Sequence, residues 1–349
     1  MQYNNLSSTD LKVSKACLGT MSFGAHVSEE DAFKIMDKAL ELGVNFFDTA
    51  ELYAVPPCAE TYGVTEEIIG RWMKSRNCRD KIVLATKVVG PTRRGHTDYI
   101  RGGNTCFDRK NIREALEESL KRLQTDYIDL YQLHWPDRNL NTFGQRAYIP
   151  RENDNMTDIE STLEVLAELQ KEGKVKHFGL SNESPWGTMK FLQIAKEKGL
   201  PRMVSIQNNY SLLTRTYDSG MSEVSHREDI GLLAYSPLGF GVLGGRYLDG
   251  NKPEGGRLTL YPNFVPRYTS EFVGEIIKKY KKLAEENNMT IAQMALAFVY
   301  SRKFLTSCII GPSNVQQLIE DVEAMNIQLS PEVFNAIDEI QEECPNPCA

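Results

Sequence analysis

The sequence predicts an α/β fold, a single (β/α)8 TIM barrel with long loops at the carboxyl ends of its strands and an extra C-terminal helix. Short apolar runs alternate with longer amphipathic segments, and counting them gives eight strand-then-helix units. No linker or charge-biased segment divides the 349 residues. We therefore expect one domain over residues 1–349 rather than two.

Each expected strand is a short run of apolar residues, which is the pattern of a strand buried on both faces. The helices between them have recognisable starts: Ser28 and Ser184-Pro185 are N-cap signals, and Thr290 with Gln293 forms a capping box. The expected strands are 16–20, 45–48, 81–87, 127–134, 175–181, 203–207, 231–235 and 307–310. The expected helices are 29–43, 64–76, 109–123, 158–172, 184–199, 217–227, 271–287, 291–301, 315–325 and one from 330.

Four loops are longer than usual strand-to-helix connections, and long loops on a compact scaffold are often functional. They cover residues 55–63, 90–106, 139–157 and 238–266. All four follow strands, so a barrel would place them at one mouth. We expect Met21, Phe23, Leu52 and Trp135 to wall a pocket there, which favours an apolar or aromatic ligand.

The overall composition argues against several classes of protein. The formal net charge of −7 argues against nucleic-acid binding. We expect no signal peptide, because the N-terminal residues lack a basic region followed by an apolar one, and no apolar run has the length of a membrane span. Seven irregularly spaced cysteines are typical of free thiols in a reducing cytosol, so a cytoplasmic location is expected. Cys344 and Cys348 lie in an expected frayed tail with no further metal ligands near them in sequence.

Polar side chains end consecutive strands where a barrel would carry its chemistry. Asp48 and Lys87 end neighbouring strands, and as a buried pair each would offset the other's desolvation. A cation near Tyr53 would stabilise its phenolate and lower its pKa, which makes the phenol a proton donor near neutral pH. His134 can donate a hydrogen bond to a substrate carbonyl. Taken singly, each is more often a structural residue; only their joint placement favours chemistry.

A glycine-rich loop follows the seventh strand. Residues 239–244 match the pattern G-x-G-x-x-G of dinucleotide-binding folds. Gly245, Gly250 and Pro253 follow, so no long helix opens, and no acid lies about 20 residues on as that fold requires. The loop is therefore interpreted as flexible backbone that approaches a ligand. After strand eight, Ser313 precedes a helix whose N-terminus suits an anion, although it could be only an N-cap.

These segments resemble the aldo-keto reductase superfamily over nearly the whole chain. Residues 48–53 (DTAELY), Lys87 and residues 133–136 (LHWP) are similar to its catalytic segments. Residues 179–182, 207–208, 235–239 and 317–321 are similar to its cofactor segments, in the same order. Residues 53–63 and 119–127 most resemble the Tas-type subgroup, which is related to potassium-channel β subunits.

The resemblance implies NADPH-dependent reduction of an aldehyde or ketone. Tyr53 would be the acid, Lys87 and Asp48 its tuning pair, and His134 the carbonyl orienter. Ser181, Asn182 and Gln207 would hold the carboxamide, and Tyr235 would stack on the nicotinamide. The other implied cofactor residues are Gly19, Thr20, Met21, Asp48, Ser236, Pro237, Leu238, Gly239, Gly241, Leu243, Arg246, Gly311, Ser313, Gln317, Glu320 and Asp321.

Two details of the cofactor segments bear on specificity. Arg246, with Arg257 as a second candidate, favours NADP over NAD. The family usually has Asn where Asp321 stands, and a carboxylate can accept from the adenine amino group but cannot donate. The expected partner is a small-molecule carbonyl, with no nucleic acid and no membrane.

Two alternatives remain at this stage. One is an NADPH-binding, redox-sensing auxiliary subunit with weak catalysis and a protein partner. The other is a dehydrogenase of the dinucleotide-binding fold, against which the context of the glycine loop already argues.

Overall fold

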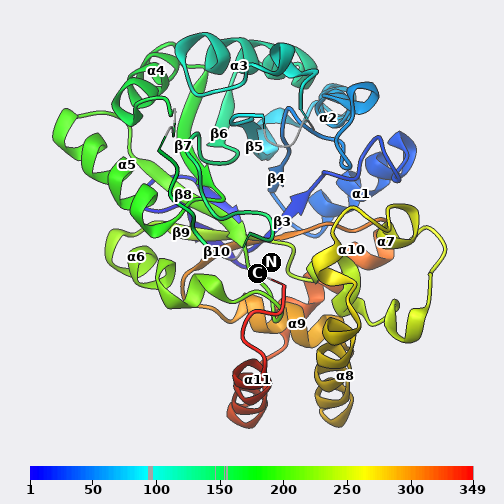
Figure 1. Cartoon of the computed structure of the whole chain (residues 1–349). Helices are drawn as coiled ribbons and strands as arrows, with labels where there is room; N and C mark the ends of the chain where they lie inside the picture. The colour runs from blue at the N-terminus through cyan, green and yellow to red at the C-terminus, as the bar shows by residue number, and fades with distance from the viewer. Residues whose placement is uncertain (93–96, 146, 153, 155, 349) are drawn as a thin grey trace.

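The computed structural model describes residues 1–92, 97–145, 147–152, 154 and 156–348, so the loops 90–106 and 139–157 lie partly outside it. Eight parallel strands close into a barrel, which confirms the predicted (β/α)8 fold (Figure 1). Around the barrel their order is β10-β3-β4-β5-β6-β7-β8-β9. Their bounds are β3 (Ala16–Gly19), β4 (Phe46–Asp48), β5 (Val83–Val88), β6 (Ile128–Leu133), β7 (Val175–Ser181), β8 (Met203–Asn209), β9 (Gly231–Tyr235) and β10 (Leu305–Ile310).

Helices follow the strands and surround the barrel (Figure 1). They are α1 (Glu29–Glu41), α2 (Val64–Arg76), α3 (Arg109–Leu123), α4 (Ile159–Lys171), α5 (Pro185–Lys198), α6 (Met221–Glu228), α7 (Arg257–Leu260), α8 (Glu271–Glu286), α9 (Ile291–Tyr300), α10 (Val315–Glu323) and α11 (Pro331–Glu343). The prediction of a single helix over 217–227 is wrong, because a 3-10 turn at Thr216–Ser219 precedes α6. Gly220 between them has non-helical dihedrals (φ −158°, ψ −50°), which interrupts the helix.

The predicted helix starts are present in the structure. The side chains of Ser28 and Ser184 accept hydrogen bonds from the backbone N–H groups of Asp31 and Gly187. At α9 both bonds of the capping box between Thr290 and Gln293 form. These caps fix where each helix begins, and so how the preceding loop leaves its strand.

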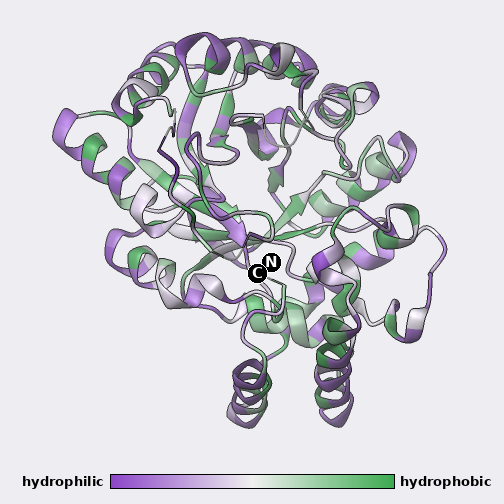
Figure 2. Ribbon diagram, in the orientation of Figure 1, coloured by the Kyte–Doolittle hydropathy of each residue, from purple (hydrophilic) through white to green (hydrophobic). Residues whose placement is uncertain are grey.

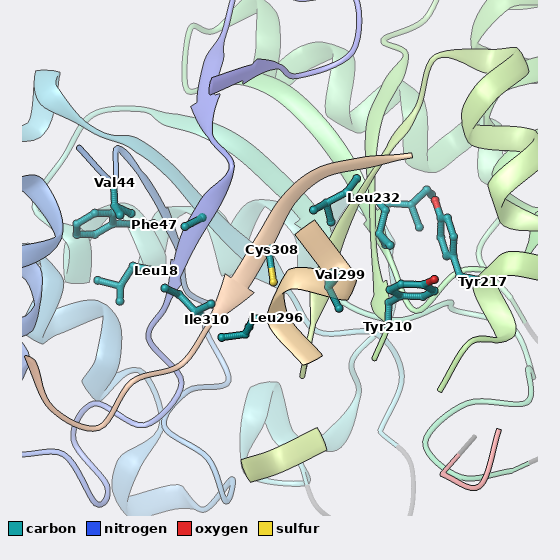
Figure 3. Packing of buried hydrophobic residues seen from close by; sticks show 14 of the residues in the cluster. Leu18, Val44, Phe47, Tyr210, Tyr217, Leu232, Leu296, Val299, Cys308 and Ile310 are labelled. Atoms are coloured by element: carbon teal, nitrogen blue, oxygen red, sulfur yellow. The ribbon is translucent and has the colours of Figure 1, made fainter. Parts of the chain in front are cut away.

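The outer helices carry both hydrophobic and hydrophilic residues, as helices that cover a barrel must (Figure 2). The contact of α9 with β10 shows the packing closely. Leu296 and Val299 of the helix lie against Cys308 and Ile310 of the strand, and all four are almost wholly buried (Figure 3). No helix in the described part of the chain has the length and apolarity needed to span a bilayer.

Two short strands before the barrel were missed by the sequence analysis. β1 (Tyr3–Asn5) and β2 (Lys12–Ser14) form an antiparallel hairpin. Leu6 and Val13 of this segment are fully buried in one cluster with side chains from seven barrel strands, among them Phe46 and Leu130. The hairpin therefore contributes side chains to the barrel interior. Each strand has only three residues, which is too few for a periodic signal.

The end of the chain is packed rather than frayed, which corrects the expectation for Cys344 and Cys348. Both side chains are buried. The backbone N–H of Cys348 donates to Leu213 O at 3.1 Å, and Thr214 Oγ1 donates to Cys348 O at 3.2 Å. The backbone N–H of Arg215 also donates to Asn346 Oδ1 at 2.5 Å. Contacts with a loop more than 130 residues away hold this tail, so local sequence could not reveal them.

Candidate active site

The carboxyl ends of β4, β5 and β6 bring the predicted catalytic residues together. Asp48 is the last residue of β4, and Lys87 is the fifth residue of β5, the strand that pairs with it. His134 follows directly after β6, and its backbone N–H donates to Val88 O at 2.9 Å. Because parallel strands end on the same side of a barrel, their side chains share one mouth.

Lys87 is the centre of the cluster. Its side chain is wholly buried, and the ammonium donates three hydrogen bonds: to Asp48 Oδ2 at 2.6 Å, Thr49 O at 2.8 Å and Tyr53 Oη at 3.2 Å. An ammonium has three protons, so its donors are fully used. Burial alone would lower the pKa of Lys87, but its interactions with Asp48 and Tyr53 together outweigh burial, and the pKa is raised. Lys87 therefore stays charged.

The other oxygen of Asp48 is held by two amides. Gln132 Nε2 donates to Asp48 Oδ1 at 3.0 Å and Gln207 Nε2 donates to it at 2.8 Å. Gln207, which is expected at the cofactor carboxamide, uses its amide nitrogen to support the Asp48 carboxylate. Gln132 was missed, although it lies two residues before His134 and strand alternation puts both side chains on the same face of that segment.

Tyr53 differs from expectation in one respect. Burial raises the pKa of its phenol above the usual value, and the charge of Lys87 opposes this only in part. The predicted lowering of the pKa is therefore wrong for this structure, because a wholly enclosed phenolate loses more hydration than one cation returns. The phenol stays protonated at neutral pH, which is the form that donates a proton.

His134 faces the same space as Tyr53. The two ring centroids are 5.8 Å apart at an interplanar angle of 78°. Burial, with Lys87 nearby, holds the pKa of His134 well below its usual value, so the ring is neutral. Its Nδ1 is buried without a hydrogen-bond partner among the described residues. A neutral imidazole with an unused ring nitrogen can bind a ligand oxygen or a water.

The apolar wall beside these groups agrees in large part with expectation. Leu52 and Trp135 are buried in one cluster with Tyr53, and Met21 packs against it. Phe23 does not belong to this wall: its side chain is fully buried in the main core. Trp135 Nε1 donates to Pro91 O at 3.1 Å, which ties the residue after His134 to the loop after β5.

The residues predicted to hold the nicotinamide lie at the ends of β7, β8 and β9. Tyr235 Oη donates to Asn182 Oδ1 at 2.6 Å, and Asn182 Nδ2 donates to His134 O at 2.9 Å. Ser181 Oγ donates to Gln207 O at 3.0 Å. At the end of β3, Thr20 Oγ1 donates to Asp48 O at 2.8 Å. These contacts join the expected cofactor residues to the catalytic cluster.

The glycine-rich loop opens no long helix, as the sequence predicted. It forms a short 3-10 segment, Gly239–Gly244, in which Gly241 has a φ of +96°. Such a φ is disfavoured for residues with a Cβ, so glycine suits this position and leaves the backbone without a side chain to cover it. The preceding Ser236 also has a positive φ (54°), Pro237 is buried and Leu238 is half-buried. Leu243 is fully buried.

The two candidate arginines differ. Arg246 is exposed, and no described residue forms an ion pair with it. Arg257 on α7 is half-buried, its guanidinium carbon lies 5.6 Å from the Phe240 ring centroid, and its Nε is buried without a partner among the described residues. A Cβ added at Gly311, just after β10, would lie 4.0 Å from Arg257 Nη2. Arg257 thus presents an unpaired cation to the end of β10.

The start of α10 carries the remaining predicted cofactor residues. The backbone N–H of Ser313 donates to Gln317 Oε1 at 2.9 Å, and Glu320 is exposed. Asp321 is buried, and its desolvation, with Glu320 adjacent, raises the pKa of its carboxyl to about 8. A carboxyl that is protonated near neutral pH can donate a hydrogen bond as an amide does, so the difference from the family's Asn is smaller than the sequence suggested.

The unpaired guanidinium, the positive-φ glycines and the unpartnered imidazole nitrogen together fit an anionic nucleotide ligand beside a polar reacting group. Among the described residues, no three His, Cys, Asp or Glu side chains gather as metal ligands would. Comparison with known proteins supports an enzyme of this kind. The aldo/keto reductase family model matches residues 15–342.

The chain belongs to the aldo/keto reductase family. Among its relatives is Protein tas of Escherichia coli K12, with 44% identity over 98% of both chains. An uncharacterized oxidoreductase, YrpG of Bacillus subtilis, is 36% identical over 97% of this chain and 96% of its own. L-Glyceraldehyde 3-phosphate reductase of E. coli O157:H7 is 30% identical over 97% and 92%. Membership in this family makes the protein an oxidoreductase that acts on carbonyl compounds, and the similarity to Tas confirms the predicted subgroup.

Proposed function

We propose that the protein reduces an aldehyde or ketone to the alcohol with NADPH, and that Tyr53 is the general acid. The observation that carries the proposal is the buried Lys87, bonded at once to Asp48 and to Tyr53 Oη. When bound, the dihydronicotinamide supplies a hydride for the carbonyl carbon. The residues predicted at the ends of β7–β9, the glycine-rich loop and Arg257 would hold this cofactor.

The chain's own residues account for the proton. Neutral His134 donates a hydrogen bond to the carbonyl oxygen and orients it. Tyr53 transfers its phenolic proton to that oxygen as it becomes an alkoxide. The charge of Lys87 stabilises the phenolate that remains, and Asp48 keeps Lys87 charged in a buried place. The apolar wall of Leu52 and Trp135 excludes water, which strengthens each of these interactions.

The proposed preference for NADP over NAD rests on Arg257 more than on Arg246, because Arg257, unlike Arg246, has a buried guanidinium nitrogen for which the described residues offer no partner. The anionic 2′-phosphate of NADP is a suitable ligand for such a cation. The substrate is a small carbonyl compound, and the net charge of −7 speaks against a nucleic-acid partner. Seven free cysteines support a cytoplasmic location.

The test is NADPH oxidation across aldehydes, ketones and quinones by wild type and Tyr53→Phe. We expect the variant to lose about 10²–10⁴ in turnover, the usual share of a general acid, and to keep its NADPH affinity in a fluorescence titration. Unchanged turnover would refute the mechanism, and tighter binding of NADH than NADPH would refute the cofactor assignment. Cofactor binding with no turnover on any carbonyl would favour the redox-sensing subunit.

A further inference from the structure

A second buried ion pair lies behind the catalytic cluster. Glu51, two residues before Tyr53, is wholly buried. Its carboxylate accepts four hydrogen bonds: Arg101 Nη1 at 2.6 Å and Nη2 at 2.9 Å, Tyr62 Oη at 2.9 Å and the backbone N–H of Val89 at 2.8 Å. A bidentate guanidinium–carboxylate pair fixes orientation as well as distance. Neither Glu51 nor Arg101 belongs to the site described above.

Arg101 is itself held in place. It lies in the loop after β5, and its side chain is only 8% exposed. Arg101 Nε donates to Asn111 Oδ1 at 2.9 Å, and the backbone N–H of Asn111 donates to Asp108 Oδ1, the N-cap of α3, at 2.7 Å. The Arg101 guanidinium therefore links the N-terminus of α3 to the loop that carries Tyr53.

Glu51 also contacts the end of the strand that carries Lys87, at Lys87 itself and at Val89 just after the strand. Its backbone N–H donates to Lys87 O at 3.3 Å, and its carboxylate accepts from Val89 N. The turn that ends in Tyr53 is closed by Tyr53 N–H donating to Ala50 O at 3.1 Å. The relative position of Tyr53 Oη and Lys87 Nζ, 3.2 Å apart, thus depends on Glu51 as well as on the two residues themselves.

We propose that the Glu51–Arg101 pair positions the general acid, by holding the Tyr53 turn against β5 so that the phenol stays in contact with the Lys87 ammonium. The proposal rests on the role proposed for Tyr53. Glu51 and Arg101 are positioning residues and act only through Tyr53. Because a charge interaction weakens with distance, a looser turn reduces the stabilisation that Lys87 gives to the phenolate.

The consequence is a measurable shift in the ionisation of Tyr53. Burial raises the pKa of this phenol and Lys87 lowers it, so loss of the contact raises the pKa further. Several other groups act on Tyr53 or lie against it and must stay in place during the test. They are Asp48 on β4, Cys17 on β3, His134 after β6, Tyr235 on β9 and Arg257 on α7.

The experiment compares wild type with Glu51→Gln, Arg101→Met and the milder Tyr62→Phe, which removes one hydrogen bond from Glu51 and leaves the ion pair. Tyrosine labelled with ¹³C at Cζ gives a resonance for Tyr53, assigned by its absence in Tyr53→Phe. We expect the onset of ionisation to move up by about one pH unit in Glu51→Gln, and by less in Tyr62→Phe. In the oxidation of an alcohol with NADP⁺, the rising limb of the pH profile of kcat/KM should also move to higher pH.

The matched control is Asp129→Asn. Asp129 is also a buried carboxylate in ion pairs, with Arg79 and Lys176, but it lies near the start of β6. This variant should be less stable and leave the Tyr53 resonance and kcat/KM unchanged. A Tyr53 resonance unmoved in folded Glu51→Gln and Tyr62→Phe would overturn the proposal. The NMR titration needs no turnover. An inactive wild type would therefore refute the proposed function, and the titration would still decide whether Glu51 and Arg101 position Tyr53.

Discussion

Charged side chains are buried at both ends of the barrel, but they are arranged differently. Near the start of β6, Asp129 accepts from Arg79 Nη2 and Lys176 Nζ, each at 2.8 Å, and from Leu84 N at 3.0 Å. Its partners reach solvent: the Lys176 side chain is 46% exposed. At the mouth, Lys87 and Asp48 are both buried, and Lys87 donates one of its three hydrogen bonds to the phenol of Tyr53.

The difference indicates what each cluster does. The Asp129 cluster joins β5, β6 and β7 and satisfies its charges with one partly buried cation, Arg79, and one exposed cation, Lys176, which is enough for a structural role. The mouth keeps buried polar atoms without partners among the described residues, such as His134 Nδ1 and Thr49 Oγ1. Unsatisfied groups of this kind cost stability and are kept where a ligand can use them.

The largest expected effect is that of Lys87→Met. Removing the ammonium leaves Asp48 as a buried, uncompensated carboxylate, which should cost about 3–5 kcal/mol in the free energy of unfolding. Turnover should fall by at least about 10²-fold, since Tyr53 loses its tuning cation. Urea denaturation and steady-state assays measure both. The matched change Arg79→Met leaves Asp129 its contact with Lys176 and should cost clearly less; equal losses would mean that the two ends do not differ as described.

A smaller effect is expected for Asp129→Asn. The variant removes one charge from a cluster in which Lys176 is exposed and can turn to solvent, and Arg79 keeps hydrogen bonds to backbone carbonyls, so we expect a loss of about 1–3 kcal/mol in the free energy of unfolding. Its kcat/KM for carbonyl reduction should match wild type. A large loss of activity in fully folded protein would show that this end of the barrel also serves the reaction.

Asp321→Asn should stabilise the protein. The pKa of Asp321 is raised to about 8 in the folded state, against about 3.9 unfolded, so its contribution favours folding only at low pH and is lost as pH rises from about 4 toward 8. The variant should gain about 1–3 kcal/mol at pH 8 and little at pH 4.5. Urea denaturation of both proteins at the two pH values tests this. A gain of the same size at both would point to packing rather than ionisation.

The smallest effect concerns His134. Burial and Lys87 hold the pKa of His134 well below its usual value, so the ring is neutral on both sides of pH 6.5. We expect kcat/KM for carbonyl reduction to show no inflection between about pH 6 and 8 from this residue. An inflection near pH 6.5 that disappears in His134→Asn would show that the imidazole is exposed to protonation after all.

Much of this protein could be predicted from its sequence, because the informative patterns are local. Apolar runs gave the eight barrel strands, and caps such as Thr290 with Gln293 gave the starts of helices. The ends of consecutive parallel strands must share one mouth, so Asp48, Lys87 and His134 could be placed together from their order alone. The glycines after β9 showed that no long helix follows, because they match no helical pattern.

What only the tertiary structure decided depends on residues far apart in the chain. Arg101 meets Glu51 across 50 residues, and the tail at Cys348 meets Thr214 across 134. The direction in which the Tyr53 pKa shifts also depends on the tertiary structure. Whether a phenol beside a cation becomes more or less acidic depends on how completely other elements exclude water from it, and sequence spacing does not measure that exclusion. Local patterns fix which groups reach the mouth, and packing fixes the energy of each group there.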